Sequence, residues 1–178
     1  NDPTVLEERP CHVPLYLSSS KGGAGSPLAE VFHTFLSHPT QWVLLLLGNS
    51  GSGKSLSTKL EAAERWSQRL QSDLDTHEPV PLFISLTGVS RHSTTLVEER
   101  LVELGFQEEK IQEMKSQTFT FYLDGYDEMK GDELTNLIQQ NSFVGLEEKV
   151  GWRGKIIITG RSQFAEQVEN YPSLFTPY

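Results

Sequence analysis

Residues 41–55 read QWVLLLLGNSGSGKS, an apolar run followed by a turn rich in glycine and serine. The apolar part, 41–47, has no polar alternation, and a run of this length predicts a strand buried on both faces, as parallel sheets require. Behind the turn, apolar side chains recur every three or four residues from Lys54 to Leu70, which predicts an amphipathic helix. A strand, a glycine-rich loop and a helix therefore follow one another directly.

The turn itself fits the pattern G-x-x-x-x-G-K-[ST] at every fixed position. Its glycines allow the backbone to turn successive N–H groups inward around a phosphate, and the positive end of the next helix adds attraction. The lysine reaches the β- and γ-phosphates of a nucleotide, and the following hydroxyl binds Mg²⁺. The alternative is a Gly/Ser-rich turn that matches by chance. The predicted nucleotide-binding residues are Gly48, Asn49, Ser50, Gly51, Ser52, Gly53, Lys54 and Ser55.

Strand and helix patterns alternate along the rest of the chain. This alternation predicts an α/β fold with a mainly parallel central sheet flanked by helices. Together with the motif at residues 48–55, it predicts a three-layer P-loop NTPase fold. Ligands in such folds bind at the carboxyl ends of the strands. The further predicted elements are strands at 12–17 (an edge strand), 80–86, 118–123 and 155–159, and helices that start at Ser26-Pro27, Ser93, Glu108 and Asp132.

The strand at 118–123 ends in a group of carboxylates, Asp124-Gly125-Tyr126-Asp127-Glu128. An aspartate at the tip of an apolar strand downstream of a phosphate loop is the expected second magnesium site, so Asp124 is predicted to orient the metal's waters beside Ser55. Asp127 or Glu128 is predicted to orient or deprotonate the attacking water, with Glu128 favoured because it reaches further. The alternative is that these two carboxylates cap the next helix or lie in solvent.

The strand at 155–159 is followed by Gly160 and Arg161. In a parallel sheet this strand is expected beside the phosphate-loop strand, where its end offers the Thr159 hydroxyl and the Arg161 guanidinium to the γ-phosphate. Arginine suits an anion with several oxygens because its donors form a planar fork. The alternative is a surface arginine that pairs with an acidic neighbour.

The amino-acid composition limits the kinds of partner that this chain is expected to bind. The 178 residues carry 15 Lys and Arg against 24 Asp and Glu, a net charge of −9, and no basic stripe appears, which argues against nucleic acid as the main partner. Residues 98–148 hold 13 acidic and 4 basic side chains, which predicts a solvated acidic face or, as the alternative, a docking face for a basic partner. The longest apolar run is too short to span a membrane. The single cysteine, Cys11, fits a reducing, cytoplasmic setting, and the five histidines show no metal-ligand spacing.

Three elements in order, GNSGSGKS (48–55), FYLDGYDE (121–128) and IIITGR (156–161), resemble those of the NACHT-type nucleotide-binding domains of the STAND class of P-loop NTPases. The middle element carries the most specific part of the resemblance. The third commonly ends in Thr-Ser-Arg in that family and here reads Thr-Gly-Arg. The resemblance covers residues 41–161. It implies Mg²⁺-dependent binding of ATP or GTP, slow hydrolysis, use of the nucleotide as a switch in signalling or assembly, and self-association through the NTPase domain.

By this interpretation residues 1–26 form a flank or linker, and residues 27–178 an NTPase domain truncated at its C-terminus. Adenine is favoured over guanine, because the nearest match to Asn-Lys-x-Asp, at 129–132, lacks the asparagine. Two other functions stay open. A P-loop kinase that phosphorylates a small acceptor would need an arginine-rich lid, and residues 86–123 contain only Arg91 and Arg100. A nucleotide-loaded interaction module with vestigial hydrolysis would use the acidic face.

Overall fold

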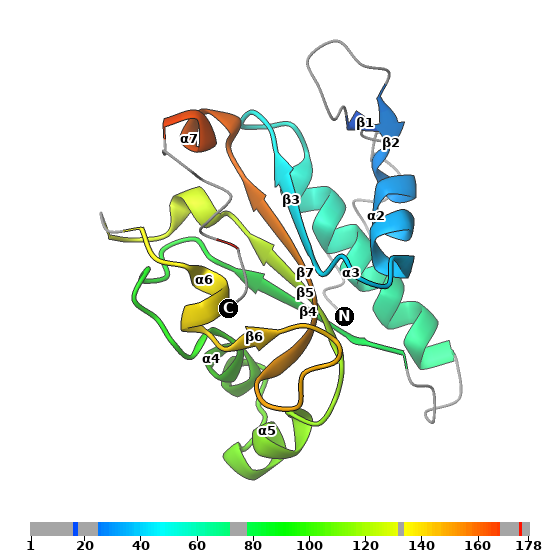
Figure 1. Ribbon diagram of the computed structural model, residues 1–178, viewed down its shortest axis with the longest axis vertical. Coiled ribbons are helices and arrows are strands. Elements are labelled where there is room, and N and C mark those ends of the chain that lie inside the picture. Colours follow the sequence, from blue (N-terminus) through cyan, green and yellow to red (C-terminus); the bar gives the residue numbers. More distant parts are fainter. Residues whose placement is uncertain (1–15, 18–24, 72–77, 132–133, 168–174, 176–178) are drawn as a thin grey trace.

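The computed structural model describes residues 16–17, 25–71, 78–131, 134–167 and 175. Its centre is a five-stranded sheet in the order β3-β7-β5-β4, with β6 paired to β7 (Figure 1). All pairings in this sheet are parallel, which confirms the predicted α/β class with a mainly parallel sheet. The strands are β3 (Val43–Leu47), β4 (Val80–Ser85), β5 (Phe119–Asp124), β6 (Phe143–Val144) and β7 (Trp152–Gly160).

The register of the sheet brings three strand ends to one edge. Leu47 of β3 pairs with Gly160 of β7, and Leu123 of β5 pairs with Ile158 of β7. The last strand, β7, lies between β3 and β5, as the sequence analysis expected for the strand next to the phosphate loop. The segments that leave the carboxyl ends of these three strands therefore start side by side.

Helices cover both faces of the sheet (Figure 1). On one face, α2 (Leu28–Ser37) and α3 (Lys54–Gln71) share an apolar cluster with Tyr122 of β5 and Ile157 of β7. On the other face, α4 (Leu96–Glu103), α5 (Glu108–Met114) and α6 (Leu137–Gln140) pack on the neighbouring residues of the same strands, such as Phe121, Ile156 and Ile158. This alternation of side chains along the strands gives three layers, helix, sheet and helix.

Burial on both faces was predicted for the strand at residues 41–47, but the structure shows it for β5 and not for β3. Among the described residues β3 lies at an edge of the sheet and only one of its five residues is buried, whereas all six residues of β5 are buried. β5 has strands on both sides and helices on both faces, so even its polar Thr120 is enclosed. An apolar run by itself does not tell a central strand from an edge strand covered on both faces.

Helix starts and short elements differ most from the predictions. Helix α2 begins at Leu28 rather than at Pro27, and Ser26–Pro27 forms a short strand, β2, that pairs antiparallel with β1 (Tyr16–Leu17). The residue before α4 is Thr95 rather than Ser93. Asn136 caps α6, because its side chain accepts hydrogen bonds from two backbone N–H groups at 3.1 Å. The predicted cap Asp132 lies outside the described residues.

Two features near the chain's end did not appear in the sequence analysis. Strand β7 begins at Trp152, three residues earlier than predicted, since its first two residues pair with β6. A short helix, α7 (Ser162–Gln167), follows β7 after one residue.

Cys11 and two of the histidines, at 12 and 77, fall outside the described residues. In the part of the chain that the structure describes, no helix is long and apolar enough to cross a membrane.

Candidate functional site

Three loops meet at the carboxyl edge of the sheet and enclose a cavity of about 310 Å³. They follow β3, β5 and β7, the three adjacent strands whose ends the register brings together. The lining consists of residues 50–56, Gly125, Asp127 and Glu128, and residues 159–161. The structure thus brings the three sequence elements singled out above to one place, although they are separated by up to about a hundred residues.

The loop after β3 is built around glycines. Gly51 and Gly53 have φ angles of 73° and 83°, a region that residues with side chains seldom adopt. A Cβ atom on Gly48 would lie 3.1 Å from the Ser52 hydroxyl, so this position also favours glycine. The loop delivers the chain into α3, whose first residue is Lys54. The strand, loop and helix context that the motif requires is therefore present.

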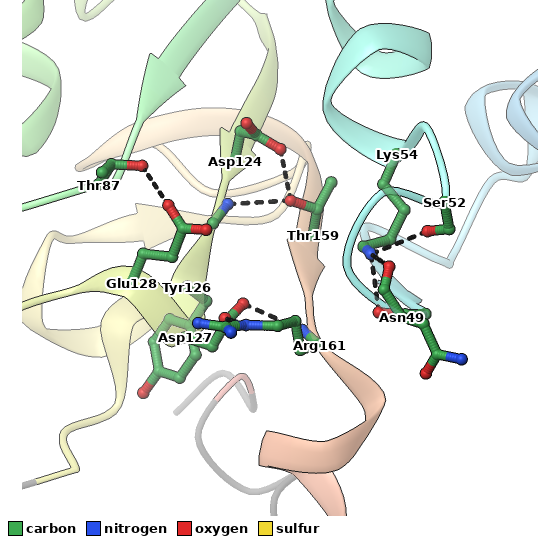
Figure 2. A network of polar contacts seen from close by, with 12 residues as sticks. Asn49, Ser52, Lys54, Thr87, Asp124, Tyr126, Asp127, Glu128, Thr159 and Arg161 are labelled. Atoms are coloured by element: carbon green, nitrogen blue, oxygen red, sulfur yellow. Dashed lines mark hydrogen bonds and ion pairs between the residues drawn. The ribbon is translucent and has the colours of Figure 1, made fainter.

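The ammonium group of Lys54 lies over the loop itself (Figure 2). Its Nζ donates hydrogen bonds to the carbonyl oxygens of Gly48 at 2.7 Å and Asn49 at 2.9 Å, and to the Ser52 hydroxyl at 3.0 Å. Partial burial lowers the pKa of Lys54, while the nearby carboxylates of Asp127 and Asp124 act in the opposite direction. Lys54 is thus the one basic side chain within the loop of residues 48–55, and its ammonium group lies against the backbone carbonyls of that loop.

The carboxylate of Asp124 is buried behind the cavity and does not line it. The Thr159 hydroxyl donates to Asp124 Oδ1 at 2.6 Å and accepts from the Gly125 backbone N–H at 2.9 Å (Figure 2). The sequence analysis expected this hydroxyl to face a γ-phosphate. In the structure it joins the ends of β7 and β5 and fixes the orientation of the predicted magnesium ligand.

Asp127 and Arg161, which both line the cavity, form an ion pair. Asp127 Oδ1 accepts from the Arg161 backbone N–H at 3.0 Å, and Oδ2 accepts from the guanidinium Nε. The Asp127 side chain is only 4% exposed, whereas that of Arg161 is 47% exposed. The hydrogen bond and the charge of Asp127 raise the pKa of Arg161. The alternative interpretation of Arg161, pairing with an acidic neighbour, is thus the arrangement seen, and it occurs inside the candidate site.

Glu128 has a different partner, which the sequence analysis did not identify. Its Oε2 accepts a 2.6 Å hydrogen bond from the hydroxyl of Thr87, two residues beyond the end of β4 (Figure 2). Gly125 makes this approach possible, since its φ of 84° starts the 3₁₀ turn η2 (Tyr126–Glu128). The only sequence signal for Thr87 is its place just after a strand, at the edge where ligands bind in such sheets.

Two oxygen donors at this edge, Ser55 and Asp124, are the predicted ligands of a magnesium ion. Magnesium prefers oxygen ligands and typically takes one or two from protein, with phosphates and water filling the other positions. Ser55 and Asp124 supply a hydroxyl and a carboxylate at the same edge. Within the described residues, no group of three or more His, Cys, Asp or Glu could hold a metal ion by itself. A phosphate-free metal cage is therefore not formed by the described residues.

Comparison with protein-family models gives no match for this chain, and no curated protein matches it significantly. The NACHT resemblance consequently stays a prediction from the three sequence elements.

Proposed function

We propose that this chain is a nucleotide-binding domain that binds Mg-ATP in the loop of residues 48–55 and hydrolyses it slowly, as a switch in signalling or assembly. One observation carries the proposal. A glycine-rich loop with the Lys54 ammonium bonded to it opens into the same cavity as two carboxylates and an arginine that follow neighbouring strands. A motif that matched by chance would have no reason to be placed opposite these groups.

The loop would bind the phosphates. Its backbone N–H groups and the start of α3 favour an anion, and Lys54 can exchange its three bonds to the loop for phosphate oxygens. Ser55 and Asp124 would hold Mg²⁺, which when bound neutralises charge on the phosphates. Thr159 would keep the Asp124 carboxylate in place, because it restrains one oxygen and the backbone beside it.

The carboxylates divide between two roles. Asp127 is held by Arg161 through two hydrogen bonds, so it is poorly placed to take a proton from water. Glu128 is bound by a single neutral hydroxyl and lines the cavity, so it is the better candidate to orient the attacking water. Arg161 would contact the γ-phosphate, because its exposed guanidinium can turn from Asp127 while its backbone N–H stays bonded to Asp127 Oδ1.

The kinase alternative is weakened by the two arginines that it would use as a lid. Arg91 is buried, and Arg100 donates to the Phe83 carbonyl and to Glu103 on its own helix. Neither side chain is available to close over a phosphate donor. ATP is favoured over GTP only by the missing asparagine at 129 noted above.

Phosphate release from Mg-ATP tests the proposal. Wild-type protein should release phosphate slowly, and Glu128→Gln should slow release by about 10²-fold or more, the range of general-base catalysis. Glu109→Gln is the matched control, because Glu109 is an exposed glutamate on α5, remote from the cavity lining. Equal release by wild type and Glu128→Gln would remove Glu128 from the mechanism. A complete lack of release by wild type, together with no binding, would refute the proposed function.

A further inference from the structure

Arg91 is a buried cation on the loop between β4 and α4. Only 4% of it is exposed, and arginine is rarely buried to this extent without partners that compensate its charge. The loop around it runs beside residues 128–130: the Arg91 N–H donates to the Lys130 carbonyl at 2.8 Å, and the Lys130 N–H donates to the Val89 carbonyl at 2.7 Å. Arg91 is thus fixed against the segment that carries Asp127 and Glu128.

The side chain of Arg91 contacts that same segment again. Its Nε donates to the Gly131 carbonyl at 3.0 Å, and its Nη2 donates to the Tyr126 carbonyl at 3.3 Å. These two carbonyls flank Asp127 and Glu128 in the chain. The guanidinium therefore spans the acidic turn from one end to the other and restrains its shape. Among the described residues, Nη1 of Arg91 has no hydrogen-bond partner. Contacts of the guanidinium with two aromatic rings, those of Tyr126 and Phe164, add to its stabilisation.

The guanidinium also contacts two aromatic rings from different segments, which themselves meet edge to face. Its carbon is 4.9 Å from the ring centre of Tyr126 and 5.3 Å from that of Phe164. Tyr126 precedes Asp127 directly, and Phe164 lies on α7, three residues after Arg161. One cation thus touches both segments whose ends form the Asp127–Arg161 pair.

We propose that Arg91 is a positioning residue that holds Asp127 and Arg161 in register across the nucleotide site. The inference rests on the proposed function and adds to it a residue remote from the cavity. Arg91 does not line the cavity, so it acts only through the two segments that it joins. A planar guanidinium can lie against both rings while it donates to both carbonyls, which the point charge of lysine cannot do.

The test compares Arg91→Lys and Arg91→Met with wild type and with Arg100→Met. Arg100 is a matched control because it is a partly buried arginine that also donates to a backbone carbonyl, that of Phe83 in β4, and not to the acidic turn. For Mg-ATP, kcat should fall about 10- to 100-fold in both Arg91 variants, the effect of a misplaced catalytic group, while Kd stays within about threefold. Arg100→Met should change neither.

Hydrogen–deuterium exchange separates positioning from general loosening. The Arg161 amide is bonded to Asp127, so it should exchange faster in both Arg91 variants, while amides of β3 and the start of α3 keep their wild-type rates. If exchange rises throughout, or if kcat is unchanged, Arg91 is a structural residue and the inference is wrong. Arg91→Lys keeps the buried charge and carries the test if Arg91→Met does not fold. Wild-type protein with neither turnover nor binding of Mg-ATP would instead refute the proposed function, and the inference with it.

Discussion

Replacing Thr159 with valine tests how the candidate site is held together. The hydroxyl of this buried residue joins β7 to β5 by donating to Asp124 Oδ1 at 2.6 Å and accepting from the Gly125 N–H at 2.9 Å. Valine has nearly the same shape, so Thr159→Val removes these two hydrogen bonds and leaves the packing largely intact. The variant therefore measures the bonds and not a cavity.

The expected cost follows from the two bonds. A hydrogen bond to a charged group contributes about 1.5–3 kcal/mol, and a backbone N–H left without an acceptor costs about 1 kcal/mol. The added methyl group returns about 0.8 kcal/mol by burial. We expect a net loss of about 2–3 kcal/mol in the free energy of unfolding, which in a chain of this size is a fall in Tm of roughly 5–10 °C.

Urea denaturation followed by circular dichroism measures this loss. Thr159→Ser keeps both hydrogen bonds and should cost about 1 kcal/mol or less. Thr58→Val is the matched control, because Thr58 is equally buried but its hydroxyl donates only to the carbonyls of Lys54 and Ser55 within its own helix. If Thr159→Val costs no more than Thr58→Val, the hydroxyl does not stabilise the junction of β5 and β7 and the reasoning is refuted.

Three further predictions use the same kind of comparison. Gly154→Ala should destabilise the fold by about 1–3 kcal/mol or prevent folding, because the new Cβ would meet the β5 backbone at 2.1 Å, whereas Gly145→Ala, with nothing within 4 Å, should be nearly neutral in urea denaturation. Lys155→Met should cost about 1–3 kcal/mol in the same assay, since its buried ammonium donates to two carbonyls at the end of α2, while the exposed Lys149→Met should not. Burial lowers the pKa of Lys54 below the ordinary 10.5, so its charge is lost at lower pH than for a free lysine, and ATP binding measured from about pH 7 to about pH 10 should weaken as pH rises. A binding curve that is flat over this range would contradict the expected loss of charge on Lys54.

The parts of the fold that sequence reasoning reached depend on neighbours in the chain. The order of strand, glycine-rich loop and helix at 41–71 is local, so spacing and composition were sufficient to predict it. The rule that parallel strands end at one edge then placed Asp124, Asp127 and Arg161 together before any contact was known. The ion pair between Asp127 and Arg161 agrees with the expectation that these residues lie close together. The two residues bind each other, whereas the predicted partners were the attacking water and the γ-phosphate.

The parts that were missed depend on contacts between distant segments. The hydrogen bond between Thr87 and Glu128 joins residues 41 positions apart, and that between Thr159 and Asp124 joins residues 35 positions apart. No sequence pattern near Thr87 or Thr159 predicts these bonds. The burial of Arg91 likewise arises only when the acidic turn and α7 close around it. A polar residue just after a strand is a weak signal, because the same composition is common in exposed loops.

Binding of Mg-ATP by wild-type protein and by Lys54→Ala, measured by calorimetry, tests the central claim most directly. Lys59→Ala is the control, since Lys59 is an exposed lysine on the same helix, α3. We predict that Lys54→Ala weakens binding by about tenfold to 10²-fold, the effect of losing a charge-assisted hydrogen bond, while Lys59→Ala binds as wild type does. Equal affinity of wild type and Lys54→Ala for Mg-ATP would contradict the assignment of residues 48–55 as a nucleotide-binding loop.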